Sequence, residues 1–394
     1  MNTGENVNSN EIFETANIIV AGITGAGKST LINAVFGEDF AETGKGRPIT
    51  QEIKEYRKEG IPIRIWDSIG FEIGSNSDGK SKTKESIAKI KSTIAEQESK
   101  ADIDRIHAIW YCINQGGNRY QSTEADFVKE LHKIGVPFII IVTQCINEDK
   151  EFVDEIDKQN RQNGITDIPV IEVLAQDKIM RGGFKIPAFG LDELVNITMD
   201  KLPSFIKTSF IAAQQISVEL KREECECIIL EYEKKALKDF RNNIPIYNQI
   251  LANGEFKSMF KKIFGIYNQY LPEEIIDECI KEVNKQYGKN QLEWFFVFDL
   301  LSKKNKKRYK DLLDDIQKNE GRSLEVKDYN DSNTVARIIV FYGYTLMLAI
   351  EEVWKECRES QINNLEVKLK EKIKKIWEEY KNRGKLHNTL CPRL

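Results

Sequence analysis

Apolar residues in the first half of the chain gather in short runs, and amphipathic stretches lie between these runs. Residues 106–113 and 136–142 are apolar almost throughout, as strands buried on both faces of a sheet are. Further strands are expected at residues 18–21, 51–57, 61–66 and 170–174, and helices at residues 31–36, 82–99, 124–133, 148–162 and 191–201. This alternation predicts an α/β fold with a mostly parallel, doubly wound sheet and one antiparallel edge hairpin.

Beyond Pro203 the alternation of strand and helix stops, and the composition becomes helical. We therefore expect three parts: a flexible leader over residues 1–13, an α/β domain over 14–203 and an all-α domain over 204–394. Residues 335–353 form the most apolar segment of the helical part and are expected to be its central helix. This segment is shorter than the roughly 20 apolar residues that a membrane span needs.

The overall composition narrows the class of protein. With 394 residues, a formal net charge of −4 and a pI of about 5.8, the chain is expected to form two domains and to bind no specific nucleic acid. The seven cysteines lack metal-binding spacing, and the polar N-terminus does not resemble a secretory signal. A cytoplasmic location is expected, with peripheral membrane attachment as the alternative.

The stretch Asn17–Thr30, NIIVAGITGAGKST, carries the strongest chemical signal. A strand, a glycine-rich loop and a helix start follow one another in the order of a phosphate-binding loop. Backbone amides of such a loop face phosphate oxygens, its lysine neutralises the β- and γ-phosphates, and its hydroxyl residue ligates Mg²⁺. The predicted nucleotide-binding residues here are Gly22, Thr24, Gly25, Ala26, Gly27, Lys28, Ser29 and Thr30.

A second group of residues is expected to complete the phosphate site. Asp67 and Gly70 belong to WDSIG at the tip of a predicted strand, where an acid reaches the Mg²⁺ shell and a glycine amide reaches the γ-phosphate. Thr50, in RPIT, is expected to give a switch-loop hydroxyl to Mg²⁺, with Thr43 as the alternative. Lys28, Thr50, Asp67 and Gly70 are thus the predicted catalytic residues, and Ser29, Thr50 and Asp67 the predicted metal ligands.

GITGAGKS, RPIT and WDSIG, at these intervals, resemble the translation-factor-related class of P-loop GTPases, and the Era-like and septin-like branches in particular. The resemblance covers residues 17–202. Its layout is also similar to that of immunity-related GTPases, which join a G domain to helices. It implies GTP or GDP as the ligand, Mg²⁺ as the cofactor, hydrolysis of GTP to GDP, and a G-domain homodimer or oligomer. Through the helical domain, a protein partner or a membrane surface is implied.

The guanine-reading motif departs from the pattern of this class. Thr143, Gln144, Cys145 and Ile146 occupy the positions of N-K-x-D, so the acid that accepts the guanine hydrogens is missing from its usual place. Asn147 or Asp149 could substitute through a shifted loop. By resemblance, Thr143 and Gln144 still belong to the base site, and the Ala175 amide faces the guanine O6. Because the base motif is degenerate, an ATPase remains an alternative.

A second departure concerns the rate of hydrolysis. Phe71 stands after Gly70, where Ras-type GTPases place a glutamine that orients the attacking water. Slow intrinsic turnover is therefore expected. A partner, dimerisation or another group such as Glu72 would raise the rate. Arg47 is a weak candidate for an arginine finger in the same chain. The leading hypothesis is a slow GTPase switch coupled to the helical domain. The alternative is a nucleotide-gated oligomerising scaffold with little turnover.

Overall fold

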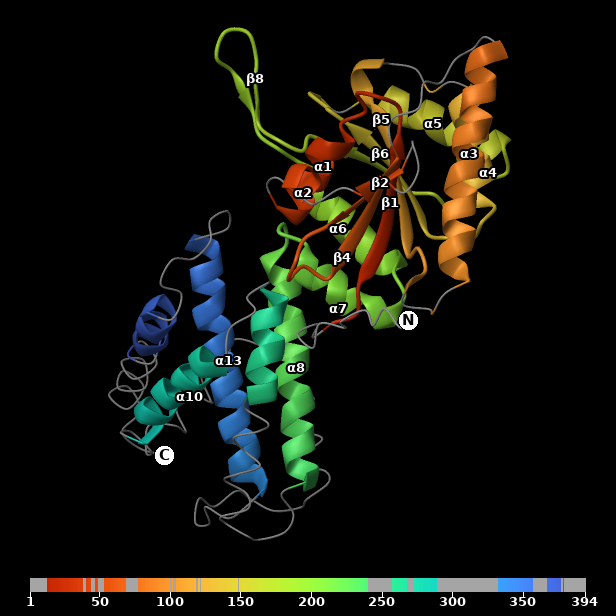
Figure 1. Cartoon of the computed structure of the whole chain (residues 1–394). Helices are drawn as coiled ribbons and strands as arrows, with labels where there is room; N and C mark the ends of the chain where they lie inside the picture. Colours follow the sequence, from red (N-terminus) through yellow and green to blue (C-terminus); the bar gives the residue numbers. More distant parts are fainter. Residues whose placement is uncertain are drawn as a thin grey trace. The chain divides into compact units, whose positions relative to one another are not determined.

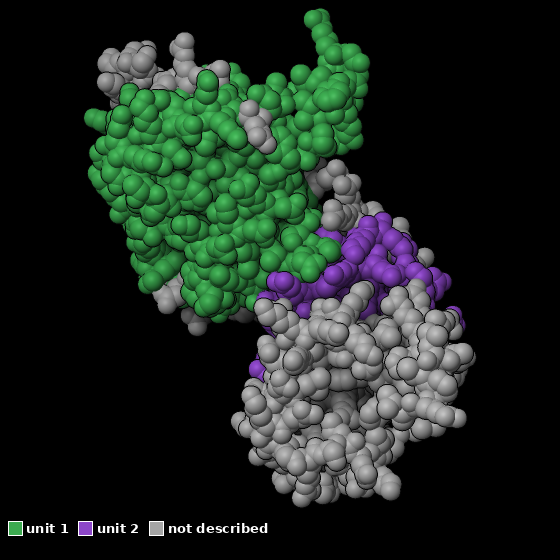
Figure 2. Space-filling model, turned by 180° about the vertical axis from the view of Figure 1, so that it is seen from behind, with its two compact units in different colours: residues 1–221 green, residues 222–394 purple. Residues whose placement is uncertain are grey.

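In the computed structural model, two compact units divide the chain, residues 1–221 and residues 222–394 (Figure 2). The structure describes residues 13–37, 40–43, 47–48, 53–68, 77–99, 101, 104–117, 120, 122–147, 149–239, 257–267, 273–288, 332–356, 367–376 and 378.

A seven-stranded sheet forms the centre of the first unit, in the order β2-β3-β4-β1-β5-β6-β7. The strands are β1 (Ala16–Gly22), β2 (Arg47–Pro48), β3 (Ile53–Arg57), β4 (Ile63–Ser68), β5 (Ala108–Asn114), β6 (Phe138–Thr143) and β7 (Val170–Val173). Neighbours from β4 to β7 pair in parallel, whereas β3 pairs antiparallel with both β2 and β4. The predicted α/β fold with one antiparallel edge is confirmed.

Helices cover both faces of this sheet (Figure 1). They are α1 (Lys28–Phe36), α2 (Phe40–Thr43), α3 (Ser77–Glu98), α4 (Ser122–His132), α5 (Lys150–Gln162), α6 (Leu191–Lys201) and α7 (Ser204–Ala213). The helix expected to begin at residue 82 begins earlier, at Ser77. Residues 77–81 are polar and carry no apolar spacing, so nothing in the hydrophobic pattern marks this first turn.

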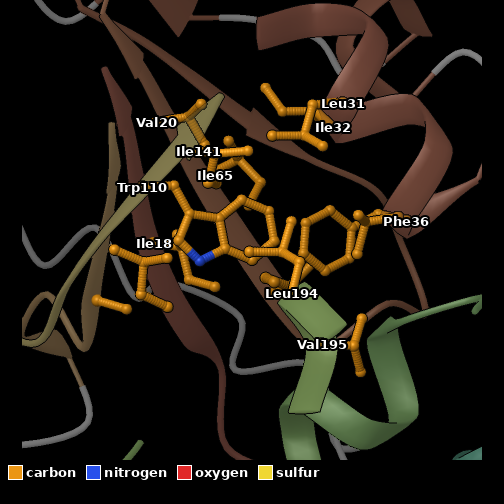
Figure 3. Close-up of a cluster of buried hydrophobic side chains, with 14 of the residues drawn as sticks. Ile18, Val20, Leu31, Ile32, Phe36, Ile65, Trp110, Ile141, Leu194 and Val195 are labelled. Atoms are coloured by element: carbon orange, nitrogen blue, oxygen red, sulfur yellow. The ribbon is translucent and has the colours of Figure 1, made fainter. Parts of the chain in front are cut away.

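Two hydrophobic cores lie on opposite faces of the sheet, because every second side chain of a strand faces the same way. In β1, Ile18 and Val20 join one core, and Ile19 and Ala21 join the other. Figure 3 shows the first core around Trp110, whose ring stacks on Phe36 with centroids 5.8 Å apart. Both faces of β1 are therefore anchored, which fixes the position of the loop that follows it.

Helix α7 belongs to the first unit. Its Phe210 packs edge-on against Phe36 and Trp110, and Ile206 is fully buried in the same core. The division between the units falls later, within α8 (Val218–Asp239), after Lys221. This aromatic packing places the division beyond the predicted boundary between residues 203 and 204.

The second unit is helical wherever the structure describes it. It contains most of α8, residues 257–266, α10 (Glu273–Gly288), α13 (Ser332–Glu356) and a further helix at residues 367–376. Gly343 of α13 lies against Ile229 of α8 so closely that an added Cβ would be 2.5 Å from the isoleucine Cγ1. Part of the predicted all-α domain, including residues 289–331, lies outside the described residues. Among the helices that the structure describes, none is long and apolar enough to cross a membrane.

Candidate nucleotide-binding site

The glycine-rich loop lies where β1 ends, at the edge of the sheet where parallel strands place their carboxyl ends. Gly25 and Gly27 both have positive φ, and Gly27 caps α1 in a left-handed conformation. The first N–H groups of α1 have no partner inside the helix, so they are available to an anion. The loop predicted from the sequence thus has the backbone form that phosphate binding requires.

Gly22 determines how closely this loop approaches the neighbouring strand. Its φ is 151°, and a Cβ added there would lie 2.5 Å from the carbonyl oxygen of Cys112 in β5. Such a distance is far shorter than a van der Waals contact, and the obstacle is backbone rather than a flexible side chain. Only glycine therefore fits at this position without displacing β5.

Lys28 lies within the loop, and its side chain is almost completely buried. Its Nζ donates hydrogen bonds to the carbonyl oxygens of Gly22, at 3.0 Å, and Ile23, at 3.3 Å. These bonds hold the ammonium group at the mouth of the loop, against a cavity of about 500 Å³. The residues that line this cavity are Thr24, Gly25, Ala26, Gly27, Lys28, Ser29, Thr30, Lys54, Tyr56, Asp67, Ser68 and Gln144.

Asp67, at the end of β4, faces the same cavity and is 7% exposed. Burial raises its pKa to about 6, while the charges of Lys28 and Lys54 act in the opposite direction. Its Oδ1 and the hydroxyl of Ser68 are buried and have no hydrogen-bond partner among the described residues. Burying a carboxylate oxygen without a hydrogen-bond partner costs free energy, so this oxygen is available to a ligand.

This donor set fits Mg²⁺, which binds oxygen ligands and keeps several waters. Asp67 offers the buried carboxylate oxygen, and Ser29 offers an exposed hydroxyl at the start of α1, on the wall of the same cavity. The structure therefore brings together two of the three predicted metal ligands. The third, Thr50, lies outside the described residues, as do Gly70, Phe71 and Glu72; of Thr43 and Arg47 only the backbone is described.

Lys54 and Tyr56, which no sequence motif marks, both line the cavity. They stand two apart on β3, and Lys54 pairs with Asp67 in the strand register. The sequence shows that residues 51–57 alternate, but it does not show which residue of β3 lies opposite the end of β4. Only that register brings the Lys54 charge to the Asp67 side of the site.

On the base side, Thr143 and Gln144 have different positions. The Thr143 side chain is buried beneath the loop, and its hydroxyl donates to the carbonyl oxygen of Ala26 at 2.7 Å. Gln144 is exposed, has a φ of 59°, and donates from Nε2 to the carbonyl oxygen of Gly25 at 2.9 Å. Asn114 at the end of β5 donates to the same oxygen at 3.3 Å. Gln144 lines the cavity, whereas Thr143 supports the loop from below.

Neither of the two residues considered as substitutes for the missing acid lines the cavity. Asp149 caps α5, because its Oδ1 accepts a hydrogen bond from the Phe152 amide at 3.1 Å. The carbonyl oxygen of Asn147 accepts one from Gln115 Nε2 at 2.8 Å. Ala175, after β7, is half-buried and packs against the first core. Among the described residues of the segment after β6, no carboxylate lines the cavity.

Comparison with known proteins identifies this arrangement. Residues 17–144, from β1 to the end of β6, match the sequence model of the family described as 50S ribosome-binding GTPase. The match indicates a P-loop GTPase domain over residues 17–144 of unit 1. The matched range contains both Lys28 and the strand end with Asp67, so the cavity that these two residues line falls within it.

Individual relatives resemble smaller parts of the chain. GTPase Der of Cereibacter sphaeroides is 49% identical over 56 residues, which are 14% of this chain and 12% of Der. This chain therefore covers only about an eighth of the length of the curated relatives it matches.

Two solved structures resemble part of the chain at low similarity. Toc33 from Arabidopsis thaliana, a dimerization-deficient mutant, is 16% identical with a TM-score of 0.32, covering 48% of this chain and 84% of Toc33. Era, in complex with MgGDPNP and part of 16S ribosomal RNA, is 18% identical with a TM-score of 0.31, covering 49% of this chain and 58% of Era.

Proposed function

We propose that the protein is a Mg²⁺-dependent GTPase that hydrolyses GTP to GDP slowly and uses its nucleotide state to act on the helical unit. The observation that supports this most is the single cavity lined by the loop residue Lys28 and the buried carboxylate Asp67. A phosphate-binding loop alone supports nucleotide binding. An acid with a buried, unsatisfied oxygen beside that loop supports a site for a triphosphate together with its metal ion.

Each residue has a separate task in this proposal. Amides at the start of α1 bind the phosphates, and Lys28 neutralises their charge. Ser29 and Asp67 hold the metal ion, with Thr50 as a third ligand. A Mg²⁺ ion held by these residues would supply positive charge that offsets the negative charge developing on the phosphate oxygens. Gly70 donates its amide to the γ-phosphate, and Lys54 adds positive charge at the Asp67 side of the cavity.

Slow turnover follows from Phe71, which cannot orient a water molecule as a glutamine does. An alternative with the same site is a nucleotide-gated scaffold that assembles and hardly hydrolyses GTP, for which Phe71 is also the supporting observation. The slow GTPase and the scaffold predict different results in one measurement, the hydrolysis rate per protein molecule as a function of protein concentration. Acceleration with concentration points to a G-domain dimer, and negligible turnover at every concentration points to the scaffold.

Guanine is the proposed base, with the aliphatic stem of Gln144 covering it and the Ala175 amide facing its O6. Support comes from the GTPase family match, since the residues at the base motif lack the usual acid. Competition of ATP against labelled GTP tests this choice directly. Displacement by ATP as effective as displacement by GTP contradicts guanine specificity and favours the ATPase alternative.

The proposed function is tested by GTP binding and hydrolysis of a Lys28→Ala variant in the full chain. We expect affinity to fall at least about 100-fold, because several charge-assisted hydrogen bonds to phosphate are lost. Lys58→Ala, which removes an exposed lysine from the turn after β3, is the matched control and should bind like the wild type. A Lys28→Ala protein that binds GTP as tightly as the wild type contradicts the proposal.

A further inference from the structure

A hairpin in unit 1, with strands too short to show an alternating pattern, projects from the rest of this unit (Figure 1). Strands β8 (Lys178–Ile179) and β9 (Lys185–Ile186) pair antiparallel, and we call residues 176–188 the tip hairpin. Figure 1 shows β8 extending beyond the sheet and helices, and Figure 2 shows the same narrow projection from behind. Within these residues only Met180 and Ile186 are half-buried, and the others are exposed.

The tip hairpin has a defined structure. At its end, the Met180 amide donates to the Phe184 carbonyl oxygen at 2.7 Å, and the Gly183 amide donates back to the Met180 carbonyl oxygen at 3.0 Å. Gly182 and Gly183 supply the positive φ angles of 97° and 85° that this tight turn needs. Its exposed side chains are therefore presented by a hydrogen-bonded turn.

At its base, the tip hairpin is joined to the GTPase domain by a pair of backbone hydrogen bonds. Leu174, directly after β7, and Phe189 each donate to the other's carbonyl oxygen, at 3.1 and 3.0 Å. Asp177 accepts a hydrogen bond from the Ala188 amide and forms an ion pair with Lys185 at 2.6 Å. The hairpin thus follows Ala175, the proposed base residue, and is connected directly to that loop.

Two large apolar side chains are exposed on this short element: Ile179 at 75% and Phe184 at 70%. Ile179 pairs with Lys185 and shares its face, whereas Phe184, one residue before Lys185, points to the opposite face. Both faces of the hairpin therefore offer apolar surface to solvent. A two-stranded hairpin is only marginally stable in water by itself, so a partner that buries both faces would stabilise it.

Positive charge accompanies the apolar side chains. Lys178, Arg181 and Lys185 are exposed on the hairpin, and Asp177, its one acidic residue, is already paired with Lys185. The projection is therefore cationic, although the whole chain has a formal net charge of −4. A negatively charged surface attracts such a cationic projection, although it repels the acidic protein as a whole.

We propose that the tip hairpin docks the protein on an anionic phospholipid membrane, with Phe184 and Ile179 entering the headgroup region and Lys178 and Arg181 contacting lipid phosphates. A lipid interface buries both faces of an inserted projection and needs no complementary shape. A protein groove that covered a single face of the hairpin would leave either Phe184 or Ile179 exposed. The observations thus favour the membrane over a protein partner.

The test is flotation of the full-length chain with vesicles of phosphatidylcholine alone and of phosphatidylcholine with phosphatidylserine. We expect binding to the anionic vesicles only. The double variant Phe184→Ser/Ile179→Ser should bind them at least about tenfold more weakly, because two apolar side chains no longer leave water. The double variant Lys178→Gln/Arg181→Gln should lose about fivefold for each charge, with a smaller dependence on salt.

Phe205→Ser is the matched control, since Phe205 of α7 is 50% exposed and lies outside the hairpin; it should bind vesicles like the wild type. Light scattering without vesicles and GTP affinity are measured on the same proteins. Absence of wild-type binding to anionic vesicles overturns the proposal, and so does unchanged binding of the Phe184→Ser/Ile179→Ser variant. If the wild type binds no vesicles and the Phe184→Ser/Ile179→Ser variant loses self-association, the proposal is overturned, and the hairpin instead binds a second copy of the chain. Because GTP affinity is measured separately, failure of this proposal is distinct from failure of the GTPase proposal.

Discussion

The hydroxyl of Thr143 donates one hydrogen bond to the carbonyl oxygen of Ala26, at 2.7 Å, and lies 3.1 Å from the carbonyl oxygen of Ile113. It thereby connects the end of β6 to the phosphate-binding loop and to β5 at one buried point. The position that carries an asparagine in the guanine motif thus holds the loop in place. This side chain therefore links the segment where the base site is proposed to the phosphate-binding loop.

Thr143→Val tests this coupling. Valine has nearly the same shape but leaves the Ala26 carbonyl oxygen without its donor, so we expect a loss of about 1–3 kcal/mol in the free energy of unfolding. GTP affinity should also fall, because the loop is less firmly held. Thr166→Val, at an exposed threonine of the same unit, is the control for both denaturation and binding measurements. A variant as stable as the control would show that the buried bond contributes nothing.

Gly22→Ala tests the close approach of the loop to β5. The added Cβ would lie 2.5 Å from the Cys112 carbonyl oxygen, so β1 and β5 must move apart, with an expected cost of about 1–3 kcal/mol in addition to backbone strain. Gly164→Ala is the matched control, because Gly164 also has a positive φ of 79° but nothing lies within 4 Å of its added Cβ. The difference between the two unfolding free energies isolates the clash. Equal values contradict it.

Lys54→Met tests the charge that the register of β3 brings to the site. The side chain keeps its approximate length and loses its charge, so we expect the turnover of GTP to fall about tenfold if Lys54 acts on charge that develops during hydrolysis. The affinity for GDP should change less, since GDP lacks the γ-phosphate. Lys58→Met, at the exposed turn after β3, serves as the control. An equal loss of affinity for GTP and GDP would instead indicate uniform binding by Lys54.

In the helical unit, Glu351 of α13 is almost completely buried, and Arg222 of α8 and Lys355 both donate hydrogen bonds to its carboxylate. Burial would raise the pKa of Glu351, but the bonds from Arg222 and Lys355 outweigh it and hold the pKa below its ordinary value. Because the folded-state pKa is lowered, this carboxylate adds stability at pH values above its unfolded pKa. That stability is lost as the pH falls through the folded pKa.

Arg222→Met should therefore destabilise the helical unit by about 3 kcal/mol near pH 7, because it leaves the buried carboxylate short of a partner. Thermal unfolding followed by circular dichroism, between pH 7 and pH 4, measures the effect. Glu351→Gln should remove the part of the pH dependence that this group contributes. Lys281→Met, which removes an exposed lysine paired with the exposed Glu278, is the control and should have little effect. A pH dependence unchanged in Glu351→Gln contradicts the assigned role.

Much of the GTPase domain could be predicted from the sequence. Strands buried on both faces, such as β5 and β6, have almost no polar residues, and the phosphate-binding loop has a fixed order of glycine, lysine and serine. These features are local, so the sequence alone contains them. The expected α/β fold was confirmed for this reason.

The remaining features depend on long-range pairing. Lys54 reaches the cavity only through its register opposite Asp67, and nothing in QEIKEYR specifies that register. Thr143 was assigned to the base, whereas the path of the loop above it buries its hydroxyl. The tip hairpin has strands of two residues each, too short to show an alternating pattern. Its signal was the Gly182-Gly183 pair between apolar and basic residues.

The central claim is that Lys28 and Asp67 belong to one site for a metal-bound triphosphate. The most direct measurement is the calorimetric affinity for GTP with Mg²⁺ and with a chelator, in the wild type and in Asp67→Asn. We predict that Mg²⁺ strengthens GTP binding by the wild type at least about tenfold, and that Asp67→Asn loses most of this gain while it still binds GTP without the metal. An equal gain from Mg²⁺ in both proteins would contradict the account.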